Sequence, residues 1–228
     1  MSLRANSLAL LIVLLTQSLV AAQAKLEYDA VFDFGHVGID FKVYHTYTLH
    51  NRGKRLVKIT GLNASCDCTS LTKSDSLIRP RDSVLIHATF DSKNFYGPVN
   101  KSFRIYTDDP TTPEIQLFYV ATVGQWFNGI KPDPVSVLLL PAHKSRRVTI
   151  PNRAFDKITL AGFETSNSHF DINVTRGEAT KGANLELDVT PKSDLPKGTY
   201  RSSLTLSVGV PAEDDHITLT IPVKIVRY

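Results

Sequence analysis

Apolar and polar side chains alternate along much of the chain beyond residue 25, and no long segment keeps a helical period. An alternation of period two places every second side chain on one face of a β-strand. Turn-forming sequences such as Asn51-Arg52-Gly53 and Asp108-Asp109-Pro110 separate the alternating runs. Short strands with turns at this spacing are typical of a β-sandwich. In the first half of the chain the runs are 26–34, 43–49, 84–90, 101–106 and 115–123.

The second half of the chain repeats this plan. Its last two runs can be laid over the last two of the first half, because Gly97 and Gly198 precede similar patterns of serine and apolar residues. Each half has about 100 residues, which is enough for one sandwich. The sequence therefore predicts an all-β protein of two tandem immunoglobulin-like β-sandwich domains, at 25–125 and 131–228. The candidate strands of the second half are 135–140, 146–150, 158–163, 170–174, 185–189, 202–208 and 216–225.

Residues 1–24 have the composition of a secretory signal peptide. Arg4 supplies a positive start, residues 8–15 form a short apolar run, and Ala22-Gln23-Ala24 fits the small-x-small cleavage rule. We expect cleavage after Ala24 and a periplasmic or secreted mature protein. No later apolar run is long enough to cross a bilayer, so no membrane span is expected.

The charge of the predicted mature chain is mildly basic, with 25 basic and 22 acidic side chains once Arg4 is removed. The basic residues are scattered rather than gathered in a stripe, so a nucleic-acid partner is not expected. The sequence lacks nucleophile-elbow, zinc-protease and phosphate-loop motifs, and its seven histidines show no ligand spacing. We therefore expect neither enzymatic activity nor a cofactor.

The tetrapeptide Cys66-Asp67-Cys68-Thr69 contains the only two cysteines of the chain. In a flat strand their Cα atoms would lie ~6.6 Å apart, near the upper limit for a disulfide, whereas a bend at Asp67 would bring them closer. Three interpretations stay open. The pair forms a local disulfide or two buried thiols, or it captures a soft metal such as copper(I), or it exchanges thiols and disulfides.

The joint between the predicted domains carries Trp126, the only tryptophan, and Phe127. These side chains either pack between the two domains or contact a partner at the surface, and large aromatic rings at a joint favour packing. Lys131-Pro132-Asp133-Pro134 follows them. Its prolines predict a semi-rigid elbow rather than a loose tether.

Residues 26–123 resemble a bacterial family of exported immunoglobulin-like domains of unknown function, related to Hydin, abnormal-spindle and major-sperm-protein sandwiches. Asp67 departs from the family pattern by replacing a glycine between the cysteines, and Arg81 replaces the glycine of a turn. The resemblance implies a fold and an exported location, because the family has no established reaction. The motifs that carry it are Phe34-Gly35-His36-Val37, the strand 47–53 that ends in Asn51-Arg52-Gly53, Cys66-Asp67-Cys68-Thr69, the turn at 78–83, Phe90-Asp91, Gly97 and Thr107-Asp108-Asp109-Pro110.

A duplicated sandwich without a catalytic motif favours a non-catalytic binding or scaffold protein of the cell envelope. We expect it to engage a protein partner through its sandwich surfaces. The alternative is copper(I) or thiol–disulfide handling through Cys66 and Cys68. Copper(I) would need further soft or imidazole ligands, and the only methionine lies in the predicted signal peptide.

Overall fold

A computed structural model describes residues 24–210 and 215–228, apart from the side chain of Asp215. The predicted signal peptide lies outside the described residues except for Ala24. The described chain is built from β-strands, with a single turn of 3-10 helix, η1 (Phe127–Gly129), between its two halves. The all-β prediction is confirmed. None of the described residues forms a helix long and apolar enough to cross a membrane.

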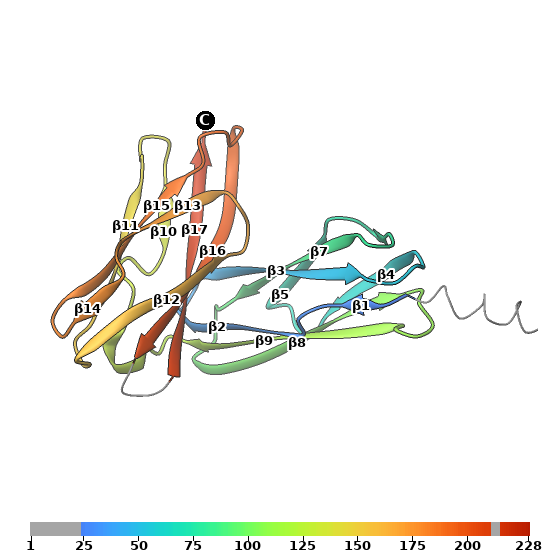
Figure 1. Cartoon of the computed structure of the whole chain (residues 1–228), viewed down its shortest axis with the longest axis horizontal. Coiled ribbons are helices and arrows are strands. Elements are labelled where there is room, and N and C mark those ends of the chain that lie inside the picture. Colours follow the sequence, from blue (N-terminus) through green and yellow to red (C-terminus); the bar gives the residue numbers. More distant parts are fainter. Residues whose placement is uncertain (1–23, 211–214) are drawn as a thin grey trace, which may run out of the picture.

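The N-terminal half, residues 24–125, consists of two packed sheets (Figure 1). One sheet has the strand order β1-β3-β7-β5, and the other contains β2-β9-β8-β4-β6. Apolar side chains between the two sheets form two adjoining core clusters, one around Leu49 and Phe103 and the other around Phe34 and Tyr119. The strands are β1 (Leu26–Glu27), β2 (Val31–Val37), β3 (Lys42–Asn51), β4 (Val57–Ala64), β5 (Thr69–Lys73), β6 (Leu77–Ile78), β7 (Ser83–Asp91), β8 (Gly97–Thr107) and β9 (Glu114–Val123).

The C-terminal half, residues 126–228, has a core of its own, formed by buried residues from Ile130 to Ile225. A three-stranded sheet of order β11-β15-β13 packs over this core, and β14-β12-β16-β17 with β10 forms the other layer. The strands are β10 (Val137–Leu139), β11 (Arg146–Pro151), β12 (Lys157–Thr165), β13 (Phe170–Arg176), β14 (Glu178–Thr180), β15 (Asn184–Pro191), β16 (Gly198–Val210) and β17 (Asp215–Arg227).

Strand β2 joins the sheets of the two halves. It pairs in parallel with β9 of its own half and, at His36 opposite Leu219, with β17 of the other half. The contact is close at Gly35, where φ is 60° and a Cβ atom would lie 2.0 Å from the carbonyl oxygen of Thr218. Only glycine fits this position, because it tolerates the positive φ and has no side chain to clash. One sheet therefore runs continuously through both halves.

The predicted run 26–34 is wrong as a single strand. Residues 26–27 pair with β3 in one sheet, whereas β2 pairs with β9 in the other. The segment 28–30 has no strand pairing of its own and carries the chain between the layers. Alternation alone does not show such a change of sheet, because it reports which face a side chain occupies and not which strand is its neighbour.

A buried asparagine closes the same turn in each half. Asn51 and Asn152 are both fully buried, and each Nδ2 donates to a carbonyl 27 residues further along the chain, that of Ile78 and Ala179 respectively. Each Nδ2 also donates to a nearby loop carbonyl, and each Oδ1 accepts from a backbone N–H. This correspondence extends the internal repeat beyond the strands in which the sequence shows it.

Candidate functional site

Cys66 and Cys68 lie in a turn between β4 and β5 rather than in a strand. The backbone N–H of Thr69 donates to the carbonyl oxygen of Cys66 at 3.2 Å, which closes the bend at Asp67. The two Cα atoms are 5.2 Å apart and the sulfur atoms lie at bonding distance. The turn therefore has the bend that the sequence argument required for a local disulfide.

The surroundings of the cysteine pair are hydroxyl groups and core side chains. The Thr69 hydroxyl lies 3.5 Å from Sγ of Cys66 and forms a 2.5 Å hydrogen bond with the hydroxyl of Tyr119. Burial raises the pKa of Tyr119 to about 12, against the lowering effect of that hydrogen bond. Cys68 is half-buried against the core cluster around Phe34. These neighbours anchor the turn and leave Tyr119 neutral at physiological pH.

The histidines of the paired strands β3 and β7 do not form a metal site with the cysteines among the described residues. His45 stacks on the ring of Phe32 with 3.5 Å between centroids, and His87 contacts the hydroxyl of Thr46. Within the described residues, no three side chains of His, Cys, Asp or Glu gather closely enough to hold a metal ion.

Trp126 lies where the halves meet. Its indole packs against the C-terminal core, and its ring centroid is 6.4 Å from the imidazole of His36 in β2. Phe127 packs against the same core and stacks on Phe155 with 6.1 Å between centroids. Trp126 and Arg153 also line a cavity of about 700 Å³ on the C-terminal half.

The contact between the halves is made on the outer face of the β16–β17 hairpin. Neighbouring residues of a strand point to opposite faces, so Leu204 and Ile221 enter the core while Ser203 and Thr220 face the N-terminal half. The Thr220 hydroxyl donates to the carbonyl of Phe34 at 2.6 Å, and Ser203 Oγ accepts from the N–H of Tyr44 at 2.8 Å. Both hydroxyl residues are buried, so these bonds satisfy groups that water cannot reach.

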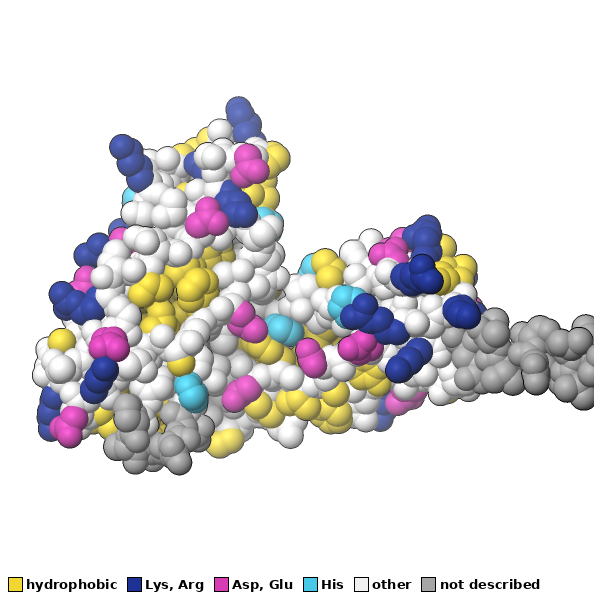
Figure 2. Space-filling model, in the orientation of Figure 1, with side chains coloured by type: hydrophobic (Ala, Val, Ile, Leu, Met, Phe, Trp, Pro, Cys, Tyr) yellow, Lys and Arg dark blue, Asp and Glu magenta, His cyan; other side chains and the backbone are white. Residues whose placement is uncertain are grey.

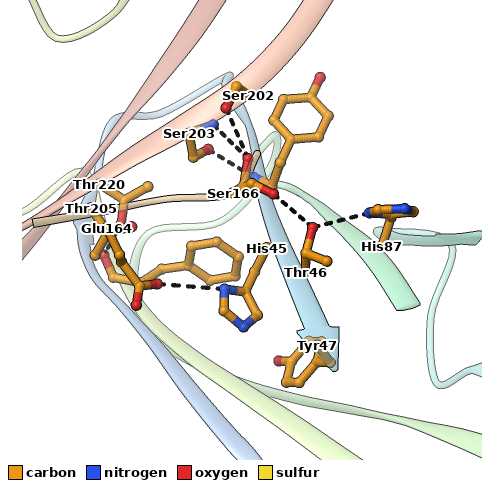
Figure 3. Close-up of polar contacts among 12 residues, drawn as sticks. His45, Thr46, Tyr47, His87, Glu164, Ser166, Ser202, Ser203, Thr205 and Thr220 are labelled. Atoms are coloured by element: carbon orange, nitrogen blue, oxygen red, sulfur yellow. Dashed lines mark hydrogen bonds and ion pairs between the residues drawn. The ribbon is translucent and has the colours of Figure 1, made fainter. Parts of the chain in front are cut away.

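Strand β3 supplies further contacts across the same interface, as Figure 3 shows. The Thr46 hydroxyl donates to the carbonyl of Ser166 at 2.7 Å, and Nδ1 of His45 lies 3.6 Å from a carboxylate oxygen of Glu164. The buried hydrogen bonds of Ser203 and Thr220 fix the orientation of the two halves, because separating the halves leaves these polar groups unpaired. The halves meet at an angle, which leaves a concave corner in the space-filling view (Figure 2).

A groove of about 310 Å³ lies between the halves, beyond the edge of this interface. Its lining is apolar and aromatic with three basic side chains, and it contains no carboxylate. Leu138 in the groove wall is 43% exposed. The residues that line it are Phe41, Lys42 and Tyr44 of the N-terminal half and Ser136, Val137, Leu138, Arg201, Pro222, Val223 and Lys224 of the C-terminal half.

The pKa of the Tyr44 phenol is affected both by burial and by the positive charge in this groove. Burial raises the pKa of Tyr44, while the positive charge of Arg201 lowers it. Lys42, on the same side as Tyr44, lies 3.5 Å from the carboxylate of Asp91. The groove thus combines an aromatic wall with exposed cations, an arrangement suited to binding rather than to bond-breaking chemistry.

Sequence reasoning missed this groove. Arg201 and Lys224 are distant in sequence from Lys42 and Tyr44, and only the packing of β3 across β16 and β17 brings them together. A partial signal was nevertheless present, because Lys224 lies between Val223 and Ile225 in the predicted run 216–225, where alternation places it on the outward face. The register of the hairpin, which places Arg201 beside Lys224, is not readable from such runs.

Comparison with known proteins covers the N-terminal half most specifically. Residues 26–123 match the family described as protein of unknown function (DUF1573). This range is the one over which the sequence resembles exported immunoglobulin-like domains, so that resemblance is confirmed at the level of a family match. The Cys-Gly-Cys-Thr form of the motif and the exported location stay predictions. No curated protein sequence matches the chain.

Several solved structures are similar in fold at low sequence identity. An ASH/PapD-like domain of human CEP192 is 9% identical, with 47% of this chain and 89% of that domain covered at a TM-score of 0.38. The Caenorhabditis elegans MSP-domain protein SSP-19 is 15% identical, with 42% and 99% covered at a TM-score of 0.36. The Vibrio cholerae protease VesB is 17% identical over 44% of this chain, at a TM-score of 0.35, and the chain spans only 32% of its length. At these identities the likeness concerns the sandwich fold alone.

Proposed function

We propose that this chain is an exported, non-catalytic binding protein that engages a protein partner in the groove between its two halves. The observation that carries the proposal is the groove itself, which is open, lined by both halves and bordered by hydrogen bonds that hold the halves together. Neither half alone supplies all of its walls. A binding surface built from two fixed halves loses little conformational freedom when a partner docks.

The walls of the groove have the composition of a protein-binding surface. Phe41 and Tyr44 present aromatic area, Leu138 adds an exposed apolar side chain, and arginine supplies a hydrogen-bonding cation. Aromatic residues and arginine are enriched at protein interfaces and contribute most of their binding energy.

The cysteine turn fits the same proposal as a structural element of an exported protein. The predicted signal peptide would send the chain to an oxidising compartment, where neighbouring thiols pair. Cys66 and Cys68 are already at bonding distance, with Thr69 and Tyr119 holding the turn. We infer a local disulfide that shapes the loop between β4 and β5. A thiol count on the purified mature protein, with and without denaturant, tests this: two free thiols would contradict it.

Site-specific photo-cross-linking tests the binding proposal. A benzophenone amino acid replaces Leu138 in the groove or, as the control, Leu56 at the far end of the N-terminal half. The two side chains are similarly exposed, at 43% and 46%. In cells that naturally make the protein, we expect a discrete protein adduct from position 138 and none from position 56. No adduct, or the same adducts from both positions, would contradict the proposal.

A further inference from the structure

Three outward-facing side chains form a row across the floor and wall of the groove. Arg201 of β16 lies directly opposite Lys224 of β17, and Lys224 is paired in register with Leu138 of β10. Residues paired in this way across a sheet point to the same face, so the row reads leucine, lysine, arginine. In the next outward-facing rows of the hairpin, Ser203 and Thr220 are covered by the N-terminal half.

The charges of this row are not balanced within the described residues. Two like charges directly opposite each other on neighbouring strands are destabilising. Arg201 and Lys224 are both exposed, and neither forms an ion pair among the described side chains, whereas Lys42 across the groove is paired with Asp91. Arg147, another exposed arginine of the C-terminal half, does have a partner in Asp188 at 3.0 Å. The repulsion is relieved when an anion binds between Arg201 and Lys224.

We propose that the groove binds an extended segment of a protein partner that places a carboxylate against Arg201 and Lys224 and an apolar side chain against Leu138. This inference rests on the proposed function and names its partner by chemistry. A guanidinium binds a carboxylate through two parallel hydrogen bonds, and the lysine ammonium adds a third donor on the same side. Phe41, Tyr44 and Pro222 then cover the apolar side chains of the segment.

The shape and charge of the groove favour a protein segment over a phosphate polymer. A nucleic acid or an anionic membrane requires cations spread over a long stripe or a broad patch. Within the groove, the cations that lack an ion pair are confined to one row. Most of the ten lining residues are apolar or aromatic. A cavity of about 310 Å³ holds a few side chains rather than a duplex groove or a lipid surface.

Peptide binding measured by fluorescence anisotropy tests this inference. The probes are two labelled octapeptides, (Leu-Glu)₄ and (Leu-Gln)₄, which have the same length and apolar content but differ in charge. We expect the mature protein to bind the glutamate peptide about ten-fold more tightly at low ionic strength, with the difference shrinking as salt is added. The double variant Arg201→Gln/Lys224→Gln should bind both peptides equally.

A matched variant controls for net charge. Lys54→Gln/Arg79→Gln removes two positive charges from exposed positions of the N-terminal half outside the groove lining, and it should keep the preference for the glutamate peptide. Equal binding of the two peptides by the unmodified protein would overturn the inference. So would a preference that survives in the groove variant or disappears in the control, or tighter binding of oligo(dT) or phosphatidylglycerol vesicles through Arg201 and Lys224.

The two proposals can fail separately. A cross-link at position 138 that persists in the Arg201→Gln/Lys224→Gln variant would leave the binding function intact and refute the carboxylate preference. Absence of any cross-link together with a charge-dependent peptide affinity would keep the chemistry of the groove and refute its use by a natural protein partner.

Discussion

The internal repeat gives a matched pair of positions at which to test backbone strain. Arg81 and Gly182 occupy the same turn in the two halves, and each backbone N–H donates to the carbonyl of the buried asparagine, Asn51 or Asn152, at 2.8 and 2.7 Å. Both have a positive φ, 66° for Arg81 and 87° for Gly182. A non-glycine residue in this region is strained, so Arg81→Gly should stabilise the protein and Gly182→Ala should destabilise it.

The expected magnitude follows from the backbone alone. Left-handed conformation costs an L-residue about 1–2 kcal/mol. Glycine offsets about 0.5–1 kcal/mol of this difference, because it raises the conformational entropy of the unfolded chain. At Gly182 no atom lies within 4 Å of an added Cβ, so no steric clash adds to this balance. Each substitution should therefore change the free energy of unfolding by about 0.5–1 kcal/mol, in opposite directions.

Urea unfolding of the mature protein, followed by tryptophan fluorescence and circular dichroism, measures both changes. With a slope of about 2 kcal/mol per molar urea, the midpoint should move by roughly 0.3–0.5 M. An unchanged or lower midpoint for Arg81→Gly would refute the reasoning. It would show that the Arg81 side chain makes a stabilising contact that outweighs its backbone strain.

Three further predictions use the same unfolding measurement. Asn51→Ala and Asn152→Ala should each cost about 3 kcal/mol, because each removes three hydrogen bonds and leaves buried carbonyls unpaired; losses below about 1 kcal/mol would contradict this. Tyr119 has a pKa of about 12 in the fold against 10.0 when unperturbed, so the stability that comes from burying its neutral phenol is complete below pH 10 and is lost as the pH rises toward 12. Tyr119→Phe should therefore flatten the fall in the urea midpoint between pH 9 and 11.5. An identical fall in the variant would argue against burial of Tyr119 as the cause of the pH dependence. Reducing a bond between Cys66 and Cys68 should cost at most about 1.5 kcal/mol, since so short a loop constrains the unfolded chain little; a loss of several kcal/mol on adding dithiothreitol would show that the turn depends on the bond for its packing.

The sequence was sufficient for the strands with long alternating patterns. β3, β7 and β9 lie where the runs predict them, because their buried faces follow a period of two. The β16–β17 hairpin also lies where its runs predict it, although the N-terminal half buries part of its outer face as well. The segments β4, β5 and β6 were not predicted. Thr60, Gly61 and Asn63 interrupt the apolar pattern of β4, and β6 has only two residues, so their pairing depends on neighbours rather than on local composition.

The candidate site was less accessible to sequence reasoning than the fold. The cysteine turn could be placed because its chemistry is local, and its bend at Asp67 was one of the geometries considered. The groove could not, since it requires the register of Arg201 with Lys224 and the packing of Tyr44 over them. Both depend on contacts between residues far apart in the chain, which patterns along one strand do not contain.

The sharing of β2 limits how this protein can be divided. A fragment that begins at residue 126 would keep its own core but would expose the edge of β17 around Leu219, where β2 normally lies. Unpaired backbone N–H and C=O groups on such an exposed edge pair with strands of other molecules. The fragment should therefore self-associate even though every residue of its hydrophobic core is present. An early segment of the chain, β2, thus covers an edge of its last strand, β17, and we expect the two halves to unfold together rather than as two separable modules.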